Sequence, residues 1–369
     1  MFPFFSYIHR PFSILLLLFC LLFPPPLPAT YLPVSATGNL TDFVTNNTWH
    51  TFVRFMDAEK GSRPDGMAEL KRYFRRFGYL PPENQNLTDL FDDEFEQALI
   101  LYQRNLGLNE TGRLDHPTMK VIVSPRCGVG DFTDAGRGGG GGGGDVKTTR
   151  RFAYFYGQPR WVRTTPMMLT YAFSPGYVID YVGMPEIRAA FAAAFGRWSA
   201  VIPVNFTESE DYPAADIRIG WYSGDHGDGE AFDGVLGVLA HAFSPENGRF
   251  HLDAAERWAV DFEAERSKVA IDLESVATHE IGHVLGLAHS SVREAVMYPN
   301  LSPRTRKVGL RMDDVEGIQA LYGSNPNYRY DSRLESDLSS GRAMDPHRRK
   351  GLMWVAAMAV VACLLGLRL

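Results

Sequence analysis

The chain has few cysteines and no excess of basic residues. Its 369 residues include only Cys20, Cys127 and Cys363, and we expect the first and last of these to lie in segments that are removed. A framework of disulfides is therefore excluded, and Cys127 is left as a lone thiol. The formal net charge of −6 gives no indication of a nucleic-acid partner. A hydrophobic fraction of 45% is enough for a substantial core, and the length favours two domains.

Long hydrophobic runs occur only near the two ends. Residues 12–23 are almost wholly apolar, follow Arg10 closely and lead into a proline-rich stretch, which predicts a secretory signal peptide over residues 1–29. We therefore expect a secreted protein. Six Asn-x-Ser/Thr triplets suit that compartment as glycosylation sites, at Asn39, Asn46, Asn86, Asn109, Asn205 and Asn300.

The carboxyl-terminal end predicts attachment to a membrane. Residues 324–350 are polar and lack apolar periodicity, and residues 351–369 form a hydrophobic tail long enough to span a bilayer. The small residues Ser339, Ser340 and Gly341, followed by a polar spacer, match a GPI-attachment signal. We therefore favour a lipid anchor at Ser339 or Ser340, in the outer leaflet of the plasma membrane, over a retained transmembrane helix.

The remainder divides at a run of glycines. Helical spacing of apolar residues predicts a small helical bundle at about residues 60–120. Residues 136–144 are nearly all glycine, which predicts a flexible linker that ends a first unit, 30–149. A second unit, 150–323, has strand patterns at 169–173 and 216–221 and helical patterns after Pro185, from Asp272 to Leu285, and after Asp313-Asp314. Its class is α+β or α/β.

One helix of the second unit carries the residues of a catalytic zinc site. His279 and His283, four apart, present two imidazoles on the same helix face, and Gly286 allows the turn that brings His289 back as a third ligand. Three protein ligands leave one tetrahedral position for a water molecule, whose pKa zinc lowers to about 7. Glu280 would take the proton of that water as general base, which predicts peptide hydrolysis without a covalent intermediate.

The alternative is a set of unrelated histidines. The third histidine and a later Met297-Tyr298-Pro299 follow in the order of the metzincin pattern, which disfavours that alternative. We expect Met297 to pack beneath the metal and not to bind it.

Cys127 has a use in this chemistry. A thiolate is a strong zinc ligand, and on the fourth position it would displace the water and keep the enzyme silent. Its neighbours Pro125, Arg126 and Gly128 predict an exposed, irregular segment, and Arg126 and Asp131 are spaced to pair across a turn. The alternative is an inert buried thiol.

A second group of ligands lies upstream. His226, Asp228, His241 and His251 offer three imidazoles and a carboxylate, the closed set of a structural zinc. Nearby acidic residues and glycines could bind calcium through oxygen, although such loops are more often solvated turns. The calcium candidates are Asp233, Gly234, Asp253 and Glu256.

These motifs resemble those of matrix metalloproteinase precursors, and the short form resembles the plant members. The similarity covers roughly residues 60–323. Residues 125–131, Pro-Arg-Cys-Gly-Val-Gly-Asp, are similar to the family's cysteine switch, which implies latency through Cys127 on the catalytic zinc. The resemblance implies an α+β catalytic domain, with a twisted five-stranded mixed sheet and three helices, after a peptidoglycan-binding-like helical prodomain. It also implies the zinc set His226, Asp228, His241 and His251, and calcium on Asp233, Asp253 and Glu256.

The chain departs from many animal members in three respects. Gly130 stands where they have proline, so we expect a looser switch segment. The interval from His241 to His251 is shorter, which argues against a second loop-bound calcium, whose leftover ligand would be Asp216. We expect no haemopexin-like domain after Gly323.

The sequence thus predicts a secreted, latent zinc metalloendopeptidase that cleaves extracellular proteins or peptides after another protease activates it. Arg150-Arg151 is a candidate activation site. A glycan-binding or peptidoglycan-binding surface protein that uses residues 60–120 is the second hypothesis. A third is an astacin-like or adamalysin-like metzincin, against which Cys127 discriminates.

Overall fold

The computed structural model describes residues 49–83, 87–131 and 152–329. The predicted signal peptide, glycine linker, dibasic site and hydrophobic tail lie outside these residues, as does the polar segment 324–350 from residue 330 onward. So do Asn39, Asn46, Asn86, Ser339 and Ser340. In the described part of the chain, no helix is both long and apolar enough to cross a membrane.

The first part is a small helical unit, as predicted. It contains η1 (His50–Phe55), α3 (Met67–Arg76), α4 (Asp93–Asn105) and α5 (His116–Ile122). The side chains of Asp92 and Asp115 accept hydrogen bonds from the first turns of α4 and α5, which fixes where these helices begin. The core of this unit is rich in aromatic rings in edge-to-face or tilted contact, among them Tyr73, Phe74 and Tyr102.

The second part contains the predicted five-stranded mixed sheet. Its strands are β1 (Met167–Phe173), β2 (Val204–Glu208), β3 (Ile217–Tyr222), β4 (Ala240–Ala242) and β5 (Arg249–Asp253), in the order β2-β1-β3-β5-β4. All neighbours are parallel except β4, which runs antiparallel to β5 and ends the sheet. The short strands β6 (Trp258–Ala259) and β7 (Ile271–Asp272) form a separate pair.

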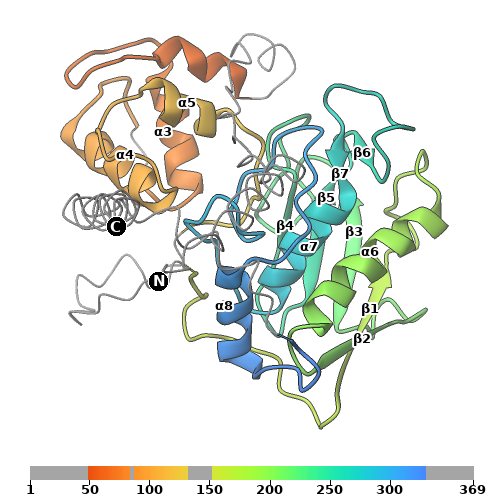
Figure 1. The fold of residues 1–369 in the computed structure, drawn as a ribbon. Helices are drawn as coiled ribbons and strands as arrows, with labels where there is room; N and C mark the ends of the chain where they lie inside the picture. Colours follow the sequence, from red (N-terminus) through yellow and green to blue (C-terminus); the bar gives the residue numbers. More distant parts are fainter. Residues whose placement is uncertain (1–48, 84–86, 132–151, 330–369) are drawn as a thin grey trace, which may run out of the picture. The chain divides into compact units, whose positions relative to one another are not determined.

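Three helices complete this part: α6 (Met184–Ser199), α7 (Leu273–Val284) and α8 (Met312–Tyr322). In Figure 1, α6 and α7 lie together against the sheet. The indole nitrogen of Trp198 on α6 donates to the carbonyl of Thr278 on α7, 2.9 Å away, in a fully buried position. This hydrogen bond joins α6 to α7, and α7 also packs against the edge strand β4. The prediction of an α+β domain with one mixed sheet and three helices is confirmed.

The start of α8 differs from the prediction. The helix begins at Met312, before the two aspartates, and Arg311 is its N-cap residue. Asp314 is the third residue of the helix and accepts hydrogen bonds from the backbone N–H groups of Arg311, Val296 and Met297. The Asp314 carboxylate thus joins the first turn of α8 to residues 296–297, and Asp314 lies inside the helix and not before it.

Candidate zinc centres

Helix α7 is positioned by its ends. The side chain of Asp272 accepts from the backbone N–H of Ser275 at 2.8 Å, and Gly286, with φ of +107°, follows the C-cap Leu285. Every residue of α7 is buried, so the face that carries the histidines is as enclosed as the packing face. The turn at Gly286 brings His289 back beside the helix.

All three imidazoles present the same ring atom, Nε2, to the centre of the site. His279 Nδ1 lies 2.7 Å from the carbonyl of Val296, His283 Nδ1 lies 2.8 Å from that of Leu287, and His289 Nδ1 lies 2.7 Å from Asp131 Oδ1. Each Nδ1 therefore donates a proton, because each faces an acceptor. The Nε2 atoms then carry lone pairs, and those of His279 and His289 are each 3.1 Å from His283 Nε2.

Bare nitrogens that face one another repel unless a cation lies between them. Zinc–nitrogen bonds at tetrahedral angles place nitrogens about 3.3 Å apart and a thiolate sulfur about 3.6 Å from a nitrogen. The sulfur of Cys127 lies 3.4 Å from His283 Nε2, and the four ligand atoms lie within 4.8 Å of one another. The residues present therefore fit a zinc ion with three imidazoles and one sulfur.

Cys127 is buried, with 4% of its surface exposed, so the prediction of an exposed switch segment is wrong. Irregular backbone of this kind can be enclosed when its polar groups find partners, and here they do. Burial raises the pKa of the Cys127 thiol well above its usual range. A thiolate at this position needs a cation to stabilise it.

The partners of the segment 125–128 come from both sides. The N–H of Arg126 donates to the carbonyl of Gly237, and the N–H of Gly128 donates to that of Ala240. In return, the N–H of Leu239 donates to the carbonyl of Arg126, and on the opposite side the N–H of Cys127 donates to the carbonyl of Pro299. The segment therefore pairs with residues 237–240 as an added parallel strand. Sequence reasoning missed this, because four residues without alternation carry no strand pattern.

Arg126 and Asp131 pair as predicted, with 2.5 Å between Arg126 Nη2 and Asp131 Oδ1. Both side chains are buried, and the guanidinium also lies over the ring of Phe77, 3.7 Å from its centroid. The hydroxyl of Tyr79 donates to the other carboxylate oxygen of Asp131 at 2.6 Å. The Arg126 charge and the His289 hydrogen bond hold the pKa of Asp131 well below its usual range, against the effect of burial.

Glu280 lies beside the converging nitrogens. Its side chain is buried, and Oε2 has no hydrogen-bond partner among the described residues. Burial raises the pKa of Glu280 to about 8, while the contact with Cys127 lowers it.

Met297 is buried and packs against Gly282, where an added Cβ would collide with the Met297 sulfur. Met297 thus has the packing position that was predicted for it.

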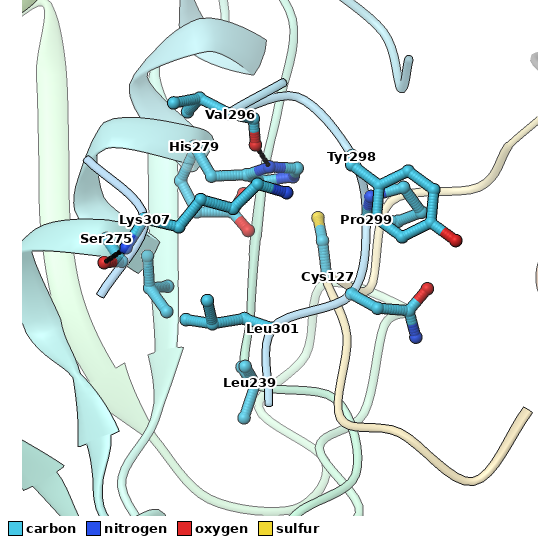
Figure 2. Close-up of a pocket in the computed structure, with 12 residues that line it drawn as sticks. Cys127, Leu239, Ser275, His279, Val296, Tyr298, Pro299, Leu301 and Lys307 are labelled. Carbon is cyan, nitrogen blue, oxygen red and sulfur yellow. Dashed lines mark hydrogen bonds between the residues drawn. The ribbon is translucent and has the colours of Figure 1, made fainter. Parts of the chain in front are cut away.

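A pocket extends from Cys127 along α7. Figure 2 shows the Cys127 sulfur pointing into it, with His279 on one side and Tyr298 on the other. Leu239 and Leu301 supply apolar wall, and the side chain of Lys307 reaches into the pocket. Burial lowers the pKa of Lys307 to about 8.

The second predicted zinc set also converges. His226 Nε2, His241 Nε2 and His251 Nδ1 lie 2.8–2.9 Å from one oxygen, Asp228 Oδ2. His241 and His251 stand opposite each other on β4 and β5, and His226 and Asp228 come from the loop after β3. His226 Nδ1 faces the carbonyl of Gly224 and therefore carries the ring proton. The Nε2 atom of His226 then has a lone pair that points at the Asp228 carboxylate. A cation removes that conflict, so these residues fit a closed four-ligand zinc site.

The proposed calcium residues lie around the loop before β4. Asp233 accepts from the N–H of Val238, Asp253 from that of Gly234, and Glu256 from that of Leu236. Burial raises the pKa of Asp253 to about 6 and that of Glu256 well above its usual range. Glu256 Oε2 is buried without a hydrogen-bond partner in the described part of the chain. A nearby divalent cation would compensate these buried carboxylates.

Asp216 lies elsewhere and has other partners. One of its oxygens accepts from Arg163 at 3.1 Å, and the other accepts from the backbone and hydroxyl of Thr170. The guanidinium of Arg163 already neutralises this carboxylate, so the structure does not favour Asp216 as a calcium ligand.

The predicted glycosylation sites differ in access. Asn109 and Asn205 are exposed. Asn300 instead donates through Nδ2 to the carbonyls of Val121 and Ser124, at 3.2 Å each. A glycan on that nitrogen would displace both bonds, so this fold disfavours Asn300 as an acceptor.

Comparison with known proteins agrees with this geometry. Residues 160–323 match the family described as matrixin, and residues 63–122 match a putative peptidoglycan binding domain. Metalloendoproteinase 1-MMP of Arabidopsis thaliana is 49% identical over 345 residues, which are 92% of each chain. Metalloendoproteinase 4-MMP of the same plant is 52% identical over 81% of this chain and 85% of its own. Human neutrophil collagenase is 35% identical over 72% of this chain and 52% of its own. The chain belongs to the matrixin family of zinc-dependent metalloendopeptidases, of the form with an amino-terminal helical domain.

Proposed function

We propose that this protein is a secreted precursor of a zinc endopeptidase in which Cys127 blocks the active site. The observation that carries the proposal is the convergence of Cys127 Sγ with the Nε2 atoms of His279, His283 and His289. The hypothesis of a binding protein with an accessory zinc domain does not account for Glu280 beside these nitrogens. It also leaves the enclosed thiol unexplained.

The roles of the residues follow from their positions. Zinc, when bound, would make a coordinated water acidic and polarise the carbonyl of the substrate. Glu280 accepts the proton of the attacking water and then donates it to the nitrogen of the leaving amine. Its enclosed position beside the converging nitrogens suits both transfers, because bulk water does not compete for the proton there.

The segment 125–131, which we call the pro-segment, supports an inference about how a substrate binds. Residues 125–128 use backbone groups of Gly237, Leu239 and Ala240, which form the open edge beside β4. We infer that an extended peptide pairs with the same edge once the pro-segment leaves, since edge strands recognise peptides in this way. The pocket beside Glu280 then receives a side chain next to the bond that is cut.

The blocking role of Cys127 is tested in the full-length precursor. Cys127→Ser replaces the thiolate by a weak zinc ligand, so we expect the uncleaved precursor to hydrolyse a quenched-fluorescence peptide, whereas the parent remains silent. Ser124→Ala, three residues before Cys127, is a control that stays in the secreted precursor: it removes only a hydroxyl that donates to the carbonyl of Lys120, so this variant should remain silent. An uncleaved Cys127→Ser precursor that binds zinc but shows no activity would refute the switch.

The location of the protein is also part of the proposal. A signal over residues 1–29 and attachment at Ser339 or Ser340 would place the enzyme on the outer face of the plasma membrane, where it meets extracellular proteins and its activating protease. A phosphatidylinositol-specific phospholipase should release it from membranes. Retention after that treatment would favour a spanning tail.

A further inference from the structure

The three histidines of the catalytic centre do not all have the same kind of partner. His279 and His283 donate from Nδ1 to the carbonyls of Val296 and Leu287, which belong to the catalytic part of the chain. His289 donates to the carboxylate of Asp131, which belongs to the pro-segment and lies 158 positions away in sequence. In residues 152–329, no group is hydrogen-bonded to His289 Nδ1.

Asp131 is held firmly in that position. Its Oδ1 accepts from His289 at 2.7 Å and from Arg126 at 2.5 Å, and its Oδ2 accepts from Tyr79 at 2.6 Å. Its backbone N–H donates to the carbonyl of Phe77 at 3.0 Å. The side chains of Asp131 and His289 are 3% and 5% exposed, so water does not compete for this hydrogen bond.

A carboxylate on the far nitrogen of a zinc-binding histidine fixes the tautomer and the ring orientation, and it makes the near nitrogen a stronger donor to the metal. Loss of such a partner typically reduces metal affinity by about 10- to 100-fold. Here the partner sits on the segment that activation removes.

We propose that Asp131 is the positioning residue for the third ligand, so that the pro-segment acts on the zinc twice. Cys127 supplies a sulfur directly, and Asp131 strengthens and orients His289. Activation then does more than vacate a coordination position, because it also releases His289 from its carboxylate. Zinc affinity therefore falls on activation by more than the loss of the Cys127 sulfur alone would cause. This inference rests on the proposed zinc centre.

The test uses zinc release from the full-length precursor. The parent carries Glu280→Gln, which prevents self-cleavage, and it is compared with the same protein bearing Asp131→Ala, Asp131→Asn or Tyr79→Phe. Zinc is transferred to a coloured chelator at neutral pH, and the second zinc site, far from Asp131 in sequence, gives an internal reference phase. We expect Asp131→Ala to speed release from the catalytic centre by about 10- to 100-fold.

The other two variants separate positioning from a general effect on folding. The substitution Asp131→Asn keeps an oxygen that can accept from His289, so release from this variant should be slower than from Asp131→Ala. Tyr79→Phe removes a hydrogen bond from the other oxygen of Asp131 without touching His289, and its release rate should stay within about twofold of the parent. A proton resonance of His289 Nδ1, protected from exchange, should be present in the parent and in Tyr79→Phe and absent in Asp131→Ala.

Two results are decisive and distinguishable. If Asp131→Ala lowers the melting temperature but leaves the release rate unchanged, Asp131 serves folding only and the inference is overturned. If Cys127→Ser changes none of the kinetic phases of zinc release seen in the parent precursor, the proposed zinc centre blocked by Cys127 is itself wrong.

Discussion

At the residue scale, Glu280 combines a charge-bearing group with a fully buried position. The carboxylate has one oxygen without a hydrogen-bond partner among the described residues, although an orphaned buried oxygen costs free energy. Structures retain such groups where chemistry uses them. The Glu280 carboxylate also contacts the Cys127 side chain, so under the proposed function it adjoins the position that a water molecule would take when the sulfur leaves.

The substitution Glu280→Gln keeps the size of the side chain and removes the base. In the precursor that carries Cys127→Ser, we expect it to lower kcat by about 10²- to 10⁴-fold, because proton transfer loses its acceptor. KM should change little, and the zinc content measured by elemental analysis should remain that of the parent. Unchanged kcat with full zinc occupancy would show that another group takes the proton.

At the element scale, α7 depends on one small residue as much as on its ligands. A Cβ at Gly282 would collide with the sulfur of Met297 and would lie 3.1 Å from the Trp198 ring. Gly282 therefore allows α7, the 295–298 turn and α6 to approach one another beneath the histidines. The ligand positions rest on that close packing.

Gly282→Ala tests this packing against a matched glycine. We expect it to lower the free energy of unfolding by about 1–3 kcal/mol, since overpacking outweighs the gain in helix propensity. Gly196 on α6 is exposed and has nothing within 4 Å of an added Cβ, so Gly196→Ala should instead stabilise by up to about 1 kcal/mol. Denaturant unfolding measures both. Equal effects of the two substitutions would contradict the packing role of Gly282.

The elements that could be predicted are those with local signals. Asp272 before α7, Pro185 at the start of α6 and the glycine at 286 mark helix ends within a few residues, and the histidine spacing needs only one helix and one turn. The pairing of residues 125–128 with 237–240 has no such signal, because its hydrogen bonds join backbone to backbone across more than a hundred residues. The burial of Cys127 and the contact of Asp131 with His289 follow from that pairing, so the sequence did not reveal them.

At the scale of the whole molecule, the two candidate zinc sites differ in what their ligands allow. In the site of His279, His283 and His289, the fourth ligand comes from Cys127, which the proposed function has leaving on activation. The site on β4, β5 and the loop after β3 has four ligands from the catalytic part and is closed. The carboxylates of Asp253 and Glu256 adjoin the loop that leads into β4, so an ion there would brace the edge that we expect substrates to use.

We therefore expect calcium to stabilise the fold. Titration of calcium at constant free zinc should raise the melting temperature by a few degrees, since a ligand at about 100 times its Kd contributes about 2.7 kcal/mol. Glu256→Gln, which keeps the shape and removes the charge, should abolish most of that rise. A melting temperature that does not respond to calcium in the parent would remove the calcium site from this account.

The central claim is that one zinc ion is bound by His279, His283 and His289 together with the sulfur of Cys127 before activation. X-ray absorption at the zinc edge of the full-length precursor tests it most directly. We predict two zinc ions per chain in the precursor. Because the spectrum averages over both ions, it should contain one sulfur neighbour for every two zinc ions, and none after activation or in Cys127→Ser. A precursor whose zinc spectrum contains only nitrogen and oxygen neighbours would contradict the claim.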